Sequence, residues 1–223
     1  MAVYENFYFN DSDNAYPEPF ASEDEVFGLL SGSESWTLCS KGESIYSRAF
    51  VQCGGALIRN RQTGLVTLIH ESVWSDSADA AMALQRNNDL DVITLHGPFG
   101  GINFKNVKYA HEKNPKEAIE CIEAVDKKSS RKYRGGNLDE ESDVHLLGYR
   151  SALLGLRESE VQSAVDRIKA GGNTVGQTRQ LADIKIPVSK SEGNRWYLLY
   201  RPNENIIWIY ESGAKKLFKY QGF

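Results

Sequence analysis

Two apolar segments joined by a short turn constrain the fold more than any other feature of the chain. Residues 49–60 and 65–71 both have the composition of β-strands, and residues 61–64 between them end in Gly64, where a tight turn tolerates a positive φ. Both segments carry apolar side chains on both faces of the predicted strand. Because such a hairpin has to be covered on both sides, it belongs inside a layered structure.

Helix signals occur in three other parts of the chain. Asn114, Pro115 and Glu117 supply an N-cap, a first-turn proline and a reciprocal acceptor at the spacing of a helix start. Apolar residues recur at helical spacing over 161–168, and Gly171-Gly172 then ends the pattern. A third helix is expected over 75–88, whereas the charged residues 126–143 indicate an exposed loop.

The remaining strand signals do not alternate regularly with the helices. Apart from the first hairpin, we expect strands over 91–96, 144–149, 183–188, 195–201 and 206–211, the last two forming a second hairpin. Without regular βαβ alternation, the pattern predicts an α+β fold, specifically a layered α/β sandwich with a mainly antiparallel central sheet.

The domain organisation follows from length and from the first residues. A chain of 223 residues is long enough for one well-buried domain and short for two. Residues 1–25 are acidic and aromatic, which indicates an N-terminal arm lying on a single domain over 26–223. The first twenty residues have neither a cationic segment nor an apolar core, so a cleaved secretory signal is not expected. A cytoplasmic protein, or one exported without a cleaved signal, fits this pattern.

Charge and cysteine usage exclude several classes of function. Lys and Arg total 26 against 30 Asp and Glu, giving a formal charge of −4, which disfavours nucleic-acid binding. No apolar run approaches the length of a membrane span. Three cysteines without paired spacing predict neither a disulfide framework nor a four-cysteine zinc site. They favour a reducing compartment, where a single cysteine can act as a nucleophile.

The other polar candidates carry weaker signals. His96 and His145 have no further ligand at metal spacing nearby, and His111 stands in a polar stretch, so we expect ordinary structural or solvated histidines. The basic residues of 127–134 fit a solvated loop better than a phosphate site. The sequence therefore predicts no metal and no organic cofactor.

Cys53 and His70 are the strongest candidates for chemistry, because the first hairpin brings them together. They lie 17 positions apart, one on each predicted strand. In an antiparallel hairpin, the numbers of two paired residues have a constant sum. If that sum is 123, Cys53 and His70 face each other. If it is 125, Cys53 faces Ser72 and His70 is its diagonal neighbour on the same face. In both registers the side chains lie roughly 4.5–8 Å apart, within or near reach of each other. A sum of 124 would place them on opposite faces.

Thiolate chemistry needs a cysteine beside an imidazole that can take its proton. Gln52, Gly54 and Gly55 flank Cys53, and the glycines would leave the backbone bare for a substrate amide and its oxyanion. The same residues also fit a simpler interpretation: a cysteine in an apolar strand is usually part of the core. Spacing alone leaves both interpretations open.

The segment resembles the cysteine-dependent protein glutamine deamidases that act on chemotaxis receptors, the CheD family. That family carries a strand cysteine, a short turn and a histidine on the next strand at this separation, which match Cys53, Gly64 and His70. It also places a hydroxyl residue shortly before the cysteine, and Ser47 corresponds to it here.

Further similarity covers about half the chain and is discontinuous. The similar segments are residues 96–101, 171–173, 184–187 and the hairpin over 193–210. Val51-Gln52 stand where the family usually has a small pair, and residues 105–170 would form an insertion in a deamidase-like domain. The cytotoxic-necrotizing-factor toxins share the same catalytic logic, so the resemblance fits a bacterial effector as well as a chemotaxis enzyme.

The resemblance implies deamidation of a glutamine side chain in a protein substrate. Cys53 would be the nucleophile, His70 the base and Ser47 an orienting group, with Gln52, Gly54 and Gly55 around the substrate and its oxyanion. A Cys–His peptidase or transglutaminase would share the thioester intermediate. The alternative from another class is a non-catalytic interaction module in which Cys53 is core.

Overall fold

The structure of the chain is a computed structural model. It describes residues 29–31, 36–40, 45–50, 53–71, 74, 76–98, 100–133, 158–187, 195–211, 213 and 216–223.

Two β-sheets form the centre of the described structure, each with five strands. The first sheet has the order β1 (Leu29–Ser31), β3 (Ile45–Phe50), β8 (Trp196–Arg201), β9 (Ile206–Glu211) and β10 (Lys216–Gln221). The second has the order β2 (Trp36–Ser40), β5 (Val66–Glu71), β4 (Gly54–Asn60), β6 (Leu90–His96) and β7 (Thr178–Lys185). Neighbouring strands are antiparallel, except for the parallel pairs β1–β3 and β6–β7.

The two sheets pack face to face around one apolar cluster, which we call the inner cluster. Leu57 and Leu68 face each other across β4 and β5, and Trp196 and Leu198 contribute from β8 of the other sheet. All four are fully buried. The contact between the sheets explains why the first hairpin needs apolar residues on this face.

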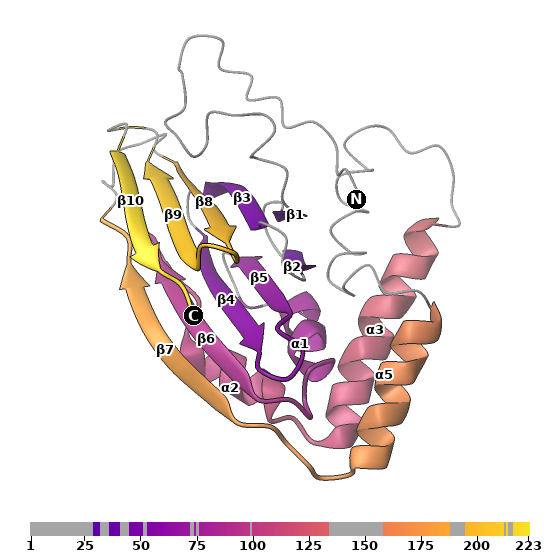
Figure 1. The fold of residues 1–223 in the computed structure, drawn as a ribbon. Helices are drawn as coiled ribbons and strands as arrows, with labels where there is room; N and C mark the ends of the chain where they lie inside the picture. Colours follow the sequence, from indigo (N-terminus) through magenta and orange to yellow (C-terminus); the bar gives the residue numbers. More distant parts are fainter. Residues whose placement is uncertain are drawn as a thin grey trace.

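Helices cover the opposite face of the second sheet. The described helices are α1 (Asp76–Ala83), α2 (Phe104–His111), α3 (Pro115–Tyr133) and α5 (Glu158–Gly171). Residues of α1 and α2 pack on β4, β5 and β6, while α3 and α5 pack on α1 and on each other. The helices therefore lie on the side of β4–β6 opposite β8–β10 (Figure 1). The hairpin β4–β5 is covered on both faces, as its composition requires.

The α+β class is confirmed, with two sheets where one central sheet was expected. The turn after β4 has Gly64 at φ +72°. The N-terminus of α3 is a capping box, in which Asn114 Oδ1 accepts from Glu117 N at 3.0 Å and Glu117 Oε2 accepts from Asn114 N at 3.4 Å. After α5, Gly172 has φ +54°, and β8–β9 forms the expected second hairpin.

Several boundaries differ from the sequence-based expectation. Residues 49–60 are not one strand: β3 ends at Phe50 in the first sheet and β4 begins at Gly54 in the second. Apolar residues continue on both sides of Gln52-Cys53-Gly54-Gly55, so the sequence carries no clear sign of this change of sheet. The expected loop over 126–143 is wrong for its first part, because α3 continues to Tyr133.

The third helix is shorter than expected. α1 ends at Ala83, where Gln85 N and Arg86 N bond three residues back instead of four. The strand expected over 183–188 begins earlier, at Thr178, because β7 is a largely exposed edge strand whose polar residues mask its pattern.

The expected arm over 1–25 and the expected strand over 144–149 lie outside the described residues. The helices α2, α3 and α5 fall within or at the edge of the expected insertion over 105–170. No described helix combines the length and the apolar composition that crossing a membrane would require.

Candidate functional site

The register of the β4–β5 hairpin places Cys53 and His70 on the same face. Gly54 pairs with Glu71 and Gly55 with His70, so paired residue numbers sum to 125. His70 follows Leu68 by two positions and shares its face, while Cys53 itself packs in the inner cluster. Cys53 itself lies one residue before β4. If the pairing is extended by that residue, Cys53 and His70 become diagonal neighbours, for which the typical separation is about 7–8 Å.

Both residues are shielded from solvent. Cys53 is 6% exposed and His70 is fully buried between the two sheets. Burial lowers the pKa of His70 from 6.5 to about 3, because an imidazolium would lose its hydration there. His70 is therefore neutral near pH 7 and a weaker proton acceptor than an exposed histidine, and a resting imidazolium paired with a thiolate is disfavoured.

The other expected site residues are distributed over both sheets. Ser47 lies on β3 of the facing sheet, where it pairs with Leu198, itself part of the inner cluster; the side chain of Ser47 is not among those described. Gln52 lies outside the described residues. Gly55 stands in register between His70 and Leu95, where a central strand uses its backbone N–H and C=O in the ladders.

Gly54 has a different environment, since a second glycine lies directly against it. A Cβ atom on Gly54 would overlap Cα of Gly101 and would lie 2.7 Å from the backbone nitrogen of Ile102. The segment that leads to Gly101 starts beside the backbone of Cys53: a Cβ atom on Gly97 would lie 2.8 Å from Trp196 Nε1 and 3.3 Å from the carbonyl oxygen of Cys53. Glycine at these positions is a packing requirement, because neither backbone could approach with a side chain present.

A polar cluster at the end of β6 borders this segment. His96 Nε2 lies 2.6 Å from Asp183 Oδ1, which also accepts a hydrogen bond from Thr94 Oγ1 at 2.5 Å. Gln180 Nε2 donates to Thr94 Oγ1 at 2.9 Å. The hydrogen bond from Thr94, with the charges of His96 and Lys185, lowers the pKa of Asp183. Sequence reasoning missed this cluster, because its histidine and carboxylate are far apart in the chain and only the parallel β6–β7 pairing joins them.

The expectation that His111 is solvated is wrong. Its side chain is fully buried at the end of α2, with Nε2 3.0 Å from the backbone oxygen of Gln85 and Nδ1 2.8 Å from Thr178 Oγ1. Burial lowers the pKa of His111, and its backbone hydrogen bonds oppose that shift. The polar residues next to it in sequence lie on the exposed side of the helix, which hid the burial of this one position.

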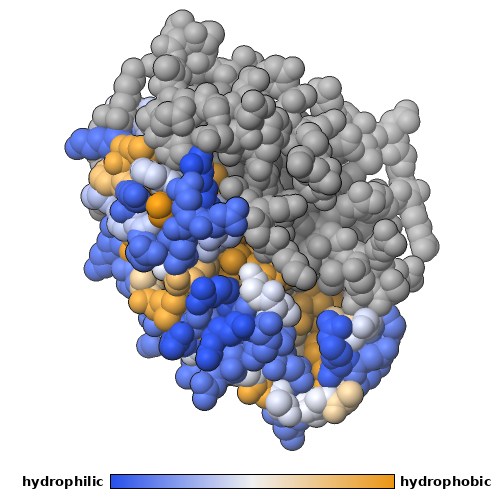
Figure 2. All heavy atoms as spheres, viewed as in Figure 1, coloured by the Kyte–Doolittle hydropathy of each residue, from blue (hydrophilic) through white to orange (hydrophobic). Residues whose placement is uncertain are grey.

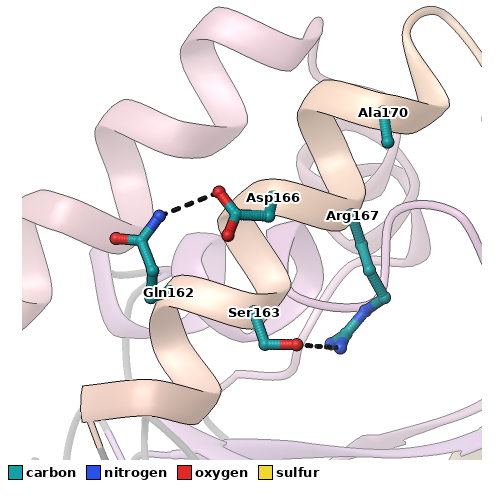
Figure 3. A pocket seen from close by; sticks show the side chains of 5 residues that line it. All are labelled: Gln162, Ser163, Asp166, Arg167 and Ala170. Atoms are coloured by element: carbon teal, nitrogen blue, oxygen red, sulfur yellow. Dashed lines mark hydrogen bonds between the residues drawn. The ribbon is translucent and has the colours of Figure 1, made fainter.

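No metal site is formed within the part of the chain that the structure describes, since no three His, Cys, Asp or Glu side chains gather there. A surface hollow does lie along α5. Its lining consists of Gln162, Ser163, Asp166, Arg167 and Ala170. These polar groups already bond one another along one helix, as Gln162 with Asp166 and Arg167 with Ser163 (Figure 3). The hollow therefore offers little to a ligand.

The described surface gives no strong sign of a docking area either. On the face shown in Figure 2, hydrophobic areas are interrupted by hydrophilic residues. The large hydrophobic side chains exposed among the described residues are Tyr109, at 67%, and Leu181, at 39%. Lys113 Nζ lies 4.6 Å above the ring centroid of Tyr109. Isolated exposed residues of this kind are ordinary on a protein surface.

No protein-family model matches the chain, and no curated protein matches it. What the Cys53 site can do therefore has to follow from its geometry, its chemistry and the sequence resemblance.

Proposed function

We propose that the chain is a cysteine-dependent protein glutamine deamidase in which Cys53 is the nucleophile and His70 the general base. The observation that carries this proposal is the register of β4 and β5, which puts a buried neutral imidazole on the same face as the thiol, one diagonal step away. A neutral histidine is the form that accepts a proton, although burial that lowers its pKa makes His70 a weaker base.

The first half of the reaction would form a thioester. His70 takes the proton of the Cys53 thiol while sulfur attacks the side-chain amide carbon of a substrate glutamine. The negative charge that develops on the amide oxygen needs backbone N–H groups, for which Cys53, Gly54 and the adjoining Gly97 are candidates. The C–N bond then breaks, and the proton on His70 leaves with ammonia.

The second half would release glutamate. A water molecule gives a proton to His70 and attacks the thioester carbon, after which the C–S bond breaks and the proton returns to sulfur. Ser47, on the facing sheet, would orient His70 or the substrate from across the inner cluster. This chemistry uses only side chains, backbone and water.

A peptidase or a transglutaminase would use the same thioester, and the acceptor decides between them. Mass spectrometry of the substrate separates the three: deamidation adds about one dalton at a glutamine, amine transfer adds the mass of the amine, and proteolysis cuts the chain.

The burial of Cys53 favours one alternative to catalysis, in which the chain is a non-catalytic interaction module. A thiol that is 6% exposed inside an apolar cluster is a common structural arrangement. In that interpretation, contacts within the fold have to offset the cost of burying His70, since a fully buried histidine loses its hydration.

The direct test incubates the full chain with folded proteins and glutamine-containing peptides and follows their masses. The proposal predicts gains of about one dalton at glutamine that disappear in Cys53→Ala and in His70→Asn. Identical gains from the wild-type chain and from Cys53→Ala would contradict it.

A further inference from the structure

The pair formed by His96 and Asp183 is more than an isolated surface contact, because its ring packs against Gly101, whose backbone packs in turn against Gly54, the residue after Cys53. The imidazole is anchored at one end, with Nε2 2.6 Å from Asp183 Oδ1. Asp183 is itself fixed by the fully buried Thr94, whose hydroxyl donates to the same oxygen at 2.5 Å. The orientation of the His96 ring is therefore determined by a short polar network.

The other edge of the ring lies against Gly101. A Cβ atom on Gly101 would overlap Nδ1 of His96, and the two residues form an isolated antiparallel bridge. Gly101 in turn lies so close to Gly54 that a Cβ on Gly54 would overlap its Cα. The imidazole, the Gly101 backbone and the Gly54 backbone thus form one continuous stack on the helix-covered face of the second sheet, behind the strand end that carries Cys53.

We propose that His96 and Asp183 are positioning residues that hold Gly101 against Gly54 and thereby fix the backbone around the Cys53 thiol. The inference rests on the proposed function, in which that backbone supplies the oxyanion donors. Both side chains are partly exposed, at 31% and 47%, so the ion pair contributes little to stability. Its effect would instead appear in reactions that need a carbonyl group held in place beside Cys53.

Two reagents separate positioning from simple access to the thiol. The first is a short peptide carrying 6-diazo-5-oxo-norleucine in place of glutamine. In its reaction the thiol proton goes to the diazo carbon, sulfur bonds that carbon and dinitrogen leaves, with the neighbouring ketone held where the glutamine amide would lie. The second is iodoacetamide, which sulfur attacks with loss of iodide and without charge building on an oxygen. Mass spectrometry of Cys53 gives both rates, and Cys121 is the internal reference.

In His96→Ala we expect the diazoketone rate at Cys53 to fall about 10- to 100-fold, as small displacements of a reacting site do. The iodoacetamide rate should stay within about threefold of wild type. His96→Gln keeps a donor near Nε2 and should restore most of the diazoketone rate. Asp183→Asn alters the partner that anchors the His96 ring, so its diazoketone rate should fall as in His96→Ala.

The matched control is Glu112→Gln, which removes an exposed ion pair with Lys108 at 3.7 Å on α2, away from the stack. It should change neither rate. A wild-type diazoketone rate in both His96→Ala and Asp183→Asn would overturn the inference and leave the proposed function standing. A parallel change with both reagents, together with a lowered Tm, would also overturn it in favour of a structural role. If Cys53 of the wild-type chain reacts with neither reagent while Cys121 does, the proposed function fails and the inference with it.

Discussion

Two buried histidines occupy regions with different chemistry. His111, at the junction of the helices with β7, is neutral because burial lowers its pKa, and the backbone oxygen of Gln85 can only accept a hydrogen bond. Nε2 therefore donates to Gln85, and Nδ1 accepts from the Thr178 hydroxyl. His70 is neutral for the same reason, but it lies between the two sheets, diagonal to the thiol of Cys53.

The residues around each histidine distinguish a structural histidine from a candidate base. Both ring nitrogens of His111 bind groups that join α2, the loop after α1 and β7, so its hydrogen bonds connect elements of the fold. His70 shares its face with Cys53, the proposed nucleophile. Burial and a lowered pKa are common to both histidines, so neither property alone identifies a site.

Removing the thiol should produce the largest effect. In Cys53→Ala we expect the deamidation rate to fall by at least about a thousandfold, because the nucleophile itself is lost. The small cavity should lower the free energy of unfolding by only about 1 kcal/mol. Glutamine deamidation by mass spectrometry and thermal unfolding check the two parts. A variant that loses its cooperative unfolding transition would support the interpretation of Cys53 as core.

Replacing each histidine with asparagine tests directly whether the two histidines have different roles. His70→Asn should reduce activity nearly as much as Cys53→Ala, since a nucleophile and its base act as a unit. His111→Asn should keep activity within about threefold but lower the free energy of unfolding by about 2 kcal/mol, because buried partners lose their bonds. Equal loss of activity in both variants would show that the two histidines do not differ in role.

Acid should unfold the protein partly through His70. Its pKa is about 3 in the folded chain, against the ordinary histidine value of 6.5 that applies once the chain unfolds, so the unfolded chain binds more protons between these values. Stability is therefore present above pH 6.5 and is lost as the pH falls, by about 2 kcal/mol between pH 7 and pH 5.

Urea unfolding at pH 7, 6 and 5 measures this loss. His111 contributes with the same sign, because its pKa is also lowered. His70→Asn should therefore flatten the dependence without abolishing it. An unchanged pH dependence in that variant would mean that His70 is not buried in its neutral form.

The smallest expected effect tests the partner of His111. Thr178→Val removes the hydroxyl that donates to Nδ1, 2.8 Å away, and leaves a buried acceptor unsatisfied. The free energy of unfolding should fall by about 1 kcal/mol, with activity unchanged. Chemical denaturation and the deamidation assay measure both. Loss of activity here would show that the His111 region is coupled to the site.

Local signals in the sequence predicted much of the fold. Gly64 marked the turn of the first hairpin, Asn114 and Glu117 marked the start of α3, and Gly172 marked the end of α5. Each depends on a few neighbouring residues whose chemistry restricts the backbone. β10 and α2 were not predicted, because their short patterns become meaningful only when β9 or the second sheet supplies a surface to cover.

The candidate site was predicted only where one hairpin contains it. The spacing of Cys53 and His70 allowed two same-face registers, and the fold selected the diagonal one. The contact of Gly101 with Gly54 and the pairing of His96 with Asp183 were beyond prediction, since they depend on a loop packing over a strand end and on a parallel pair of strands. The burial of His111 was missed for the same reason.

The most direct test of the central claim measures the rate at which iodoacetamide alkylates each cysteine at neutral pH, with peptide mass spectrometry to assign the sites. Burial and the charge of Asp79 raise the pKa of Cys121, so this partly exposed thiol is a slow reference. If His70 activates Cys53, the buried Cys53 should react faster than Cys121, and His70→Asn should remove that advantage while His111→Asn leaves it unchanged. A Cys53 that reacts more slowly than Cys121, at a rate that His70→Asn does not alter, would contradict the catalytic pair.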